Sequence, residues 1–361
     1  MAEILSNSDK DLLTAANKIC SNNLVIFPTE TVYGLGANAL NKEAIKKIFI
    51  IKQRPLNNPL IIHVLNWEMG KIFTNLSKLE NDIVVRLTKL WPGPLTLLLK
   101  SSSAVLPECN NNSDMVAIRC PSNKSARNLL TKCDVPIVAP SANISGKVSS
   151  TCFDHVTSYF KDNNITIIKD DTSKYGVEST IVKIINNNIT IVRPGVILKS
   201  DLENVLKDII DNVKINMDLT YSQSSHPGSS VSHYTIDKNV CLINFVDYDP
   251  IMCDSENNKE YTDSIINATY KYLSTCIFID FGAKNKDMIN QFKGYVDLSE
   301  SGDCLEALHN LYDVLHQINN IDCNNVIIFN FYKNKEGYYS VIYDRLYRCC
   351  SGREMLIPIF R

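Results

Sequence analysis

The segment at residues 27–63 constrains the fold most, because it predicts a strand, a helix and a second strand in close succession. The first strand is an apolar run that ends at Pro28, which is typical of a buried strand that enters a fixed turn. Asn41 can cap the helix, and Pro55 must end it, because the residue before a proline is pushed out of the helical region. Residues 60–62 then predict the second strand.

Polar side chains follow the ends of these predicted elements. A Thr-Glu-Thr sequence at 29–31 leaves the first strand, Lys52 and Arg54 lie where the helix ends, and His63 closes the second strand. Because the ends of neighbouring elements meet at one edge of a sheet, we expect these groups to approach one another.

The glycines at 34 and 36 fit the relaxed dinucleotide pattern G-x-G-x-x-A. That pattern requires the first glycine directly after a strand and an acidic residue about 20 positions later. Here residues 28–33 intervene, and the later segment is Leu-Asn-Asn at 56–58. The glycines instead predict a tight turn and close packing.

Composition is that of a globular protein of more than one domain. The chain has 361 residues, 45% of them hydrophobic and 21% charged, and its net charge is −2. This charge gives no general attraction to nucleic acid or to an anionic membrane. The N-terminus lacks an apolar signal region and no apolar run is long enough to span a bilayer, so we expect a cytoplasmic protein.

Metal and redox chemistry are not indicated. None of the twelve cysteines forms a C-x-x-C pair, and no Cys/His cluster has the spacing of a zinc site. We expect reduced core cysteines and no metal held by direct protein ligation.

The pattern of a strand that leads to polar groups recurs further along the chain. Predicted strands lead to Arg119, to Ser141 and Asn143, to Ser179 and to Arg193. A strand cap or a surface charge explains any one of these positions. With the Thr-Glu-Thr corner they make five such strand ends in one domain, which together predict a lined cleft. Two arginines, a lysine and several hydroxyls with few carboxylates favour an anionic ligand.

The known nucleotide and hydrolase motifs are missing. The chain has no Walker A sequence, no kinase glycine loop, no G-x-S-x-G elbow and no Ser-His-Asp set that can be nominated. A reaction that depends on positioning and charge neutralisation fits best, and nucleotidyl transfer is of that kind.

The second half of the chain predicts a separate domain. Residues 219–236 are polar and aperiodic, which is typical of a linker. Beyond them strands alternate with helices, which predicts a parallel sheet with right-handed crossovers. We therefore expect a first domain at 1–215, a linker at 216–237 and a Rossmann-like α/β domain at 238–361.

These motifs resemble, in order, those of the YrdC/Sua family of L-threonylcarbamoyladenylate synthases. The resemblance covers roughly residues 5 to 210. It rests on Pro28–Gly36, Lys52–Pro55, Asn58–Leu60, Trp91–Thr96, Ala117–Arg119, Ala139–Asn143, Gly176–Ile181 and Arg193–Gly195. The Lys-x-Arg and Ser-x-Asn signature of the family is intact. The C-terminal half resembles the extra domain of the long, two-domain members through its layout and the sequence Asp-Arg-Leu at 344–346.

The resemblance implies an α/β fold, with a twisted mixed sheet around a cationic cavity and a smaller C-terminal domain. It also implies that L-threonine, bicarbonate and ATP, with Mg²⁺, become threonylcarbamoyl-AMP and pyrophosphate. A downstream transfer machinery would use the product to modify tRNA. No membrane partner is implied, and direct tRNA binding stays open.

The family's site residues carry over by motif position. Those implied to hold threonine and its carbamate are Thr31, His63, Arg119, Ser141 and Ser179. Those implied to hold ATP are Lys52, Arg54, Asn58, Met115, Asn143, Thr151, Arg193 and Tyr234. Lys52, Arg54 and Arg119 would carry the catalytic charge.

The chain departs from the family in its linker. Long members have a lysine followed a few residues later by His-Tyr-Ala-Pro, whereas this chain reads Ser-His-Tyr-Thr-Ile at 232–236. The segment is either a slack tether or a lid that closes over ATP, and we favour the lid.

Two other functions are compatible with a cationic domain of this kind. One is an RNA-binding module without nucleotide turnover, which the modest pI of about 6.3 disfavours. The other is transfer of a carbamoyl group from carbamoyl phosphate, but the chain lacks the zinc-finger segments that such proteins carry beside this domain.

Overall fold

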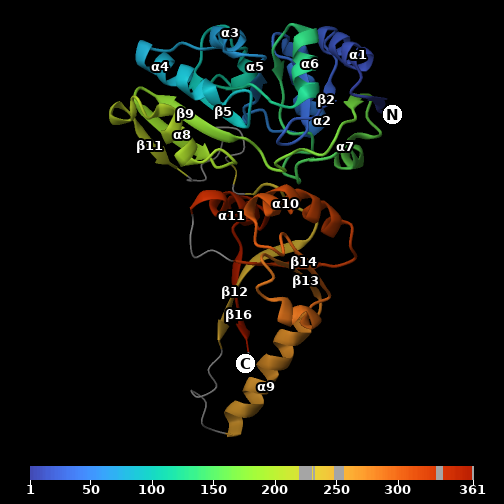
Figure 1. Cartoon of the computed structure of the whole chain (residues 1–361). Helices are drawn as coiled ribbons and strands as arrows, with labels where there is room; N and C mark the ends of the chain where they lie inside the picture. Colours follow the sequence, from blue (N-terminus) through green and yellow to red (C-terminus); the bar gives the residue numbers. More distant parts are fainter. Residues whose placement is uncertain (219–229, 231, 248–255, 331–335, 360–361) are drawn as a thin grey trace. The chain divides into compact units, whose positions relative to one another are not determined.

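The computed structural model describes residues 1–218, 230, 232–247, 256–330 and 336–359. Its contacts divide the chain into two compact units, Met1–Ser230 and Val231–Arg361 (Figure 1). Each unit has its own sheet and is described by itself.

The predicted linker, 216–237, spans the boundary between the two units. It begins inside β11 (Lys214–Met217), the last strand of the first unit. Residues 219–229 and 231 lie outside the described residues, and 232–236 belong to the second unit.

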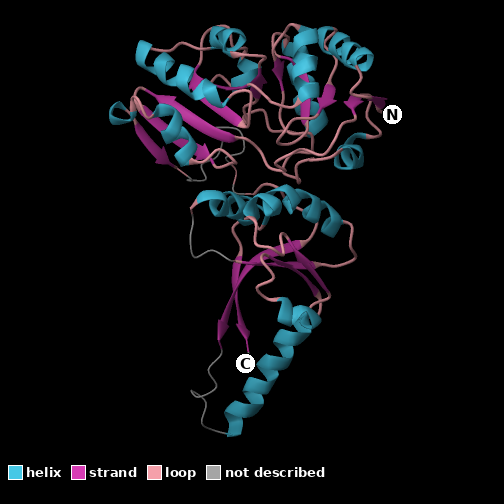
Figure 2. Ribbon diagram, in the orientation of Figure 1, coloured by secondary structure: helices cyan, strands magenta, loops and turns pink. Residues whose placement is uncertain are grey.

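The first unit is built on one mixed sheet, whose strands are magenta in Figure 2. Their order in the sheet is β1-β8-β2-β3-β7-β4-β6-β5-β9-β10-β11. Parallel and antiparallel pairs both occur, as the mixed-sheet prediction requires; β4 runs parallel to β6, and β6 antiparallel to β5. The strands are β1 (Glu3–Leu5), β2 (Val25–Phe27), β3 (Gly34–Asn38), β4 (Ile61–His63), β5 (Leu95–Lys100), β6 (Met115–Arg119), β7 (Ile137–Val138), β8 (Thr166–Ile168), β9 (Thr180–Ile185), β10 (Asn188–Arg193) and β11.

Side-chain caps fix where several helices of this unit begin. Asn41 accepts a hydrogen bond from the backbone N–H of Ala44 at 2.9 Å, and Ser77 forms a capping box with Glu80. The α-helices are α1 (Asp9–Cys20), α2 (Lys42–Lys52), α3 (Trp67–Gly70), α4 (Lys78–Leu87), α5 (Pro107–Asn110), α6 (Lys124–Cys133), α7 (Phe153–Phe160) and α8 (Lys199–Leu206), and the 3-10 helices are η1 (Lys71–Phe73), η2 (Thr88–Leu90) and η3 (Ile210–Asn212).

Helices cover both faces of this sheet. Phe27 of β2 packs in one core cluster with Leu12 of α1 and with α6. The preceding residue, Ile26, points to the opposite face and packs with Ile45 of α2. A third cluster joins α4 and α8 to β5, β9 and β10. These layers are the α/β architecture that the sequence predicts.

The glycine-rich segment is a strand, so the prediction of a tight turn there is wrong. Gly36 lies in β3 and pairs with Val25 of β2. A Cβ atom at this glycine would lie 2.7 Å from Cε1 of Phe27 and 2.9 Å from Cγ2 of Ile137. Close packing, the other half of the prediction, is therefore the reason for a glycine at this position.

The second unit has a parallel sheet with the order β14-β13-β15-β12-β16, as predicted. The strands β14 and β16 were not predicted. The elements are β12 (Asn239–Asp247), α9 (Glu256–Leu273), β13 (Cys276–Asp280), η5 (Lys286–Gln291), β14 (Gly294–Asp297), α10 (Cys304–Asn319), β15 (Asn325–Phe329), α11 (Gly337–Cys349) and β16 (Glu354–Ile359). Among the helices that the structure describes, none combines the length and the apolarity needed to cross a membrane.

The packing around β3 predicts that Gly36→Ala destabilises the protein. The added methyl group must displace the ring of Phe27 or the side chain of Ile137. Overpacking of this kind lowers the free energy of unfolding by about 1–3 kcal/mol, which urea titration measures.

Gly294→Ala is the control, because the nearest atom to its Cβ is 3.6 Å away, an ordinary contact. We expect a change within about 0.5 kcal/mol for this variant. Equal effects of the two substitutions would contradict the packing explanation.

Candidate active site

Strand pairing brings three polar side chains into one row. Two of them, His63 and Arg119, were predicted to belong to the site, and Thr96 was not. His63 at the end of β4 pairs with Arg119 at the end of β6, and Arg119 pairs with Thr96 of β5. Paired residues point to the same face of a sheet. Thr96 then shares a hydrogen bond with Ser179, whose hydroxyl oxygen lies 2.7 Å from its own.

Arg193 extends this row at the end of β10. Its Nε donates to the carbonyl of Ser179 and its Nη2 to the hydroxyl of the same serine, both at 3.1 Å. Arg193 and Ser179 are both buried. The structure thus joins two of the predicted strand ends through direct contact.

The two halves of the signature also meet. The Nζ of Lys52, the last residue of α2, donates to the carbonyl oxygen of Ser141 at 2.6 Å and to that of Asn143. The hydroxyl of Ser141 donates to Oδ1 of Asn143 at 2.5 Å. Burial, and secondarily the charge of Arg54, holds the pKa of Lys52 well below its usual range.

Arg54 organises the loop after α2. Its Nη2 donates to Oδ1 of Asn58 at 2.6 Å and to the carbonyl of Pro59 at 2.9 Å. Burial lowers the pKa of Arg54 to about 9, and the charge of Arg193 adds to this effect. The mutual influence of these cations indicates one region of positive potential, which suits an anionic ligand.

The Thr-Glu-Thr corner contacts the same region. The hydroxyl of Thr29 donates to the carbonyl of Val32 at 2.6 Å and lies 2.9 Å from the hydroxyl of Thr31. Nη2 of Arg119 donates to Oε1 of Glu30 at 2.7 Å, and this ion pair is almost completely buried.

His63 and Arg119 each keep a buried nitrogen without a partner. These atoms are Nδ1 of His63 and Nε of Arg119. Burial, with a contribution from the charge of Arg119, lowers the pKa of His63 to about 3, so its imidazole is neutral at neutral pH. Buried polar atoms are normally satisfied, and two unsatisfied ones at paired positions point to a ligand.

Apolar side chains lie beside this row on the same face of the sheet. Ile61 and Ala117 precede His63 and Arg119 by two residues and therefore share their face. Met115, predicted to contact ATP, belongs to the same cluster, and each of the six members lies in a strand. The members are Ile61, Leu98, Met115, Ala117, Ile181 and Val192.

Two further predicted ATP residues, Thr151 and Tyr234, have hydrogen-bond or ring partners of their own. Thr151 is buried, and its backbone N–H and its hydroxyl lie 3.2 and 3.1 Å from Nδ1 of His155. Tyr234 is buried in the second unit, stacked on Tyr312 with ring centroids 5.2 Å apart and with the guanidinium of Arg345 5.5 Å from its ring. No contact among the described residues tests their predicted roles.

Sequence reasoning missed two members of the site. The sequence analysis assigns no role to Thr96, although this residue follows a Pro-Gly-Pro turn and is the sole hydroxyl in an apolar run. Glu30 was noticed in its corner but given no role, although a lone carboxylate beside predicted cations was the available signal.

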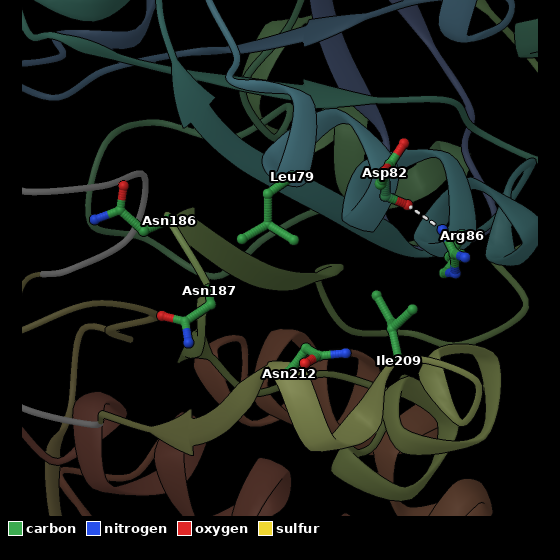
Figure 3. Close-up of a pocket in the computed structure, with 7 residues that line it drawn as sticks. All are labelled: Leu79, Asp82, Arg86, Asn186, Asn187, Ile209 and Asn212. Carbon is green, nitrogen blue, oxygen red and sulfur yellow. Dashed lines mark hydrogen bonds between the residues drawn. The ribbon is translucent and has the colours of Figure 1, made fainter.

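A pocket of about 360 Å³ lies elsewhere on the first unit, between α4, the β9–β10 turn and η3 (Figure 3). Arg86 donates there to the carbonyl of Asp82 at 3.0 Å and pairs with Asp208. None of the predicted site residues lines it. The lining residues are Leu79, Asp82, Arg86, Asn186, Asn187, Ile209 and Asn212.

Comparison with known families identifies the chain. The family described as "Telomere recombination", which unites Sua5, YciO and YrdC, matches residues 17–195. The family described as "Threonylcarbamoyl-AMP synthase, C-terminal domain" matches residues 197–351. The chain belongs to the two-domain branch of the Sua5/YrdC family, as the ordered motifs predict.

Individual relatives agree with this assignment. The threonylcarbamoyl-AMP synthase of Pyrococcus abyssi is 37% identical over 229 residues, which are 63% of this chain and 66% of that protein. A relative from Methanocaldococcus jannaschii is 36% identical over 50% of this chain and 83% of its own length. The crystal structure of P. abyssi Sua5 complexed with L-threonine has a TM-score of 0.80 at 27% identity and covers all of both chains.

The lowered pKa of His63 predicts a specific pH dependence of stability. The unfolded chain binds a proton on this histidine below about pH 6.5, whereas the folded protein does not until about pH 3. The free energy of unfolding therefore decreases as the solution is acidified from about pH 6.5 towards pH 3. For this group the decrease is about 1.4 kcal/mol per pH unit.

Urea titrations at about pH 7.5 and pH 5 test this expectation. The loss of stability on acidification should be smaller by about 2 kcal/mol in His63→Gln than in the unaltered chain. Equal losses in the two proteins would show that His63 titrates normally.

Proposed function

We propose that this protein is a nucleotidyltransferase that makes L-threonylcarbamoyl-AMP from L-threonine, bicarbonate and ATP. Pyrophosphate and water are the other products, and the product serves the N6-threonylcarbamoyl modification of adenosine in tRNA. The observation that carries the proposal is the gathering of four buried or half-buried cations, Lys52, Arg54, Arg119 and Arg193, with few carboxylates to balance them. The activity named for the relatives supports it.

The row of paired side chains suits an amino acid bound as its carbamate. We assign the carboxylate of threonine to Arg119, whose Nε is an unused buried donor. Thr31, Ser141 and Ser179 supply hydroxyls, and His63 in its neutral form offers a hydrogen bond without adding charge. The P. abyssi protein crystallised with L-threonine supports this substrate.

The cations suit the transfer step. A carbamate oxygen attacks the α-phosphorus of ATP in line, the bond from phosphorus to the bridging oxygen breaks, and pyrophosphate leaves with the electron pair. Negative charge grows on the phosphoryl oxygens, and Lys52, Arg54 and Arg193 are placed to offset it. Without a ligand, the pKa values of Lys52 and Arg54 are lowered. A bound anion raises them again, because it favours the protonated forms of both side chains.

The remaining assignments for ATP follow motif position. Asn58 and Asn143 offer amide groups, Met115 an apolar surface, Thr151 a hydroxyl and Tyr234 an aromatic ring. Mg²⁺ would arrive on the phosphates of ATP, because this ion usually keeps several waters and is held by substrate phosphates with one or two carboxylates. We place the reaction in the cytoplasm, upstream of a machinery that modifies tRNA.

Pyrophosphate release from ATP tests the proposed reaction. Release should require both L-threonine and bicarbonate. RNA binding without such turnover would support the alternative of an RNA-binding module and contradict the proposal.

Analogues of threonine sharpen this test. A site that hydrogen-bonds the hydroxyl rejects valine by on the order of 10⁴-fold in kcat/KM, whereas serine, which lacks only a methyl group, should lose about 10–200-fold. Equal use of valine and threonine would contradict recognition of the hydroxyl.

Arg119→Ala should lower kcat/KM for threonine by about 10²–10³-fold, or about 2–4 kcal/mol, because an aimed charged donor is removed. Arg119→Lys should restore little, since lysine lacks the planar fork of donors. Near-native turnover of the alanine variant at saturating threonine would show that Arg119 is not the group that holds the substrate.

A further inference from the structure

The two carboxylate oxygens of Glu30 accept hydrogen bonds from two different parts of the fold. Its Oε1 accepts from Nη2 of Arg119 at 2.7 Å. Its Oε2 accepts from the backbone N–H groups of Ser122 and Asn123, at 3.0 and 3.3 Å, where α6 begins. Glu30 is 5% exposed and Arg119 is 4% exposed, so bulk water is largely excluded from these contacts.

All three partners of the Glu30 carboxylate are hydrogen-bond donors. An ionised carboxylate accepts at both oxygens and satisfies all three donors. A glutamine of the same shape must turn its NH₂ group either towards Arg119 or towards the amides of α6, which sets a donor against a donor. The chemistry at this position therefore requires a carboxylate and not merely a side chain of this size.

The ion pair also fixes which part of Arg119 is left for a ligand. Nη2 is used by Glu30, whereas Nε is buried and has no partner. The neighbouring His63, paired with Arg119 in the sheet, likewise has an unpartnered Nδ1. An arginine that was free to rotate could bring its donors to another acceptor, and its Nε would then no longer be held ready for a ligand.

We infer that Glu30 is a positioning residue, which holds the Arg119 guanidinium so that its remaining donors meet the anionic group of the amino-acid substrate. The inference rests on the proposed function. Glu30 does not touch the substrate itself and acts through Arg119.

A simpler explanation is that Glu30 only stabilises the fold, and Glu80 provides a matched control for it. Glu80 is 7% exposed and also accepts at both oxygens, from Ser77 N–H at 2.8 Å and from Asn186 N–H at 2.9 Å. It belongs to α4, which packs in a different core cluster from the row that carries Arg119. Glu80→Gln should therefore destabilise the protein without affecting the substrate.

The experiment compares Glu30→Gln with Glu80→Gln in the full chain, by steady-state kinetics and urea unfolding. We expect Glu30→Gln to lower kcat/KM for L-threonine on the order of 10–100-fold, the range known for removing the partner that orients a metal ligand. KM for ATP should change less than about 2-fold, and Glu80→Gln should leave both KM values unchanged.

A double-mutant cycle with Arg119→Ala separates positioning from other effects. Once Arg119 is absent, Glu30→Gln should change the residual kcat/KM for threonine less than about 2-fold. Additive losses in the cycle, or equal threonine kinetics for the Glu30 and Glu80 variants, would overturn the inference.

Two further outcomes are distinguishable. If Glu30→Gln does not fold, Glu30→Asp keeps the charge but cannot span both sets of donors, and native threonine kinetics in that variant overturn the inference equally. If the unaltered chain releases no pyrophosphate in response to threonine, the proposed function fails, whereas a threonine-dependent wild type with an unaffected Glu30→Gln variant refutes only the positioning role.

Discussion

The pairing of His63 with Arg119 across β4 and β6 is the constraint on which the rest of the site depends. Side chains alternate along a strand, so a shift of one residue in this register would turn Arg119 to the opposite face. That face is apolar: Ile62 and Ile118, the residues just before the pair, pack in the core cluster that contains α2. The burial that sets the register therefore also sets the position of the two groups assigned to the substrate.

The buried cations give the site its preference for anions. Burial of a charge is unfavourable unless an opposite charge or good hydrogen bonds compensate it, and here the compensation is uneven. Arg119 has Glu30, whereas Lys52 donates to two neutral carbonyl oxygens. Arg54 likewise donates only to neutral groups, one side-chain amide oxygen and two backbone carbonyls. The lowered pKa values of Lys52 and Arg54 express the same imbalance. A ligand with several negative charges improves the electrostatics of all of them together.

Local sequence patterns predicted the strands that consist of short runs of buried apolar residues. Apolar runs that end in Pro28, His63 or Arg119 gave the strands β2, β4 and β6, whereas β3 was missed because its two glycines carry no strand signal. The partners inside the site were beyond such reasoning. Glu30 and Arg119 are 89 positions apart and Lys52 and Asn143 are 91 apart, so only the sheet topology brings them into contact.

Tyr234 has a role implied by its motif position that requires access to a ligand, whereas its side chain is buried. Family resemblance assigns it to ATP, yet its side chain is 1% exposed and is held by Tyr312 and Arg345, with its backbone at a φ of 61°. A ligand can contact this ring only by displacing what covers it, and an aromatic stack with a cation at its ring contributes on the order of 1–3 kcal/mol. ATP must supply at least that much differential binding energy to draw Tyr234 out, since a ligand shifts an equilibrium only by its preference for one state. The stack on Tyr312 therefore contributes to the energetic cost of any role of Tyr234 in nucleotide binding.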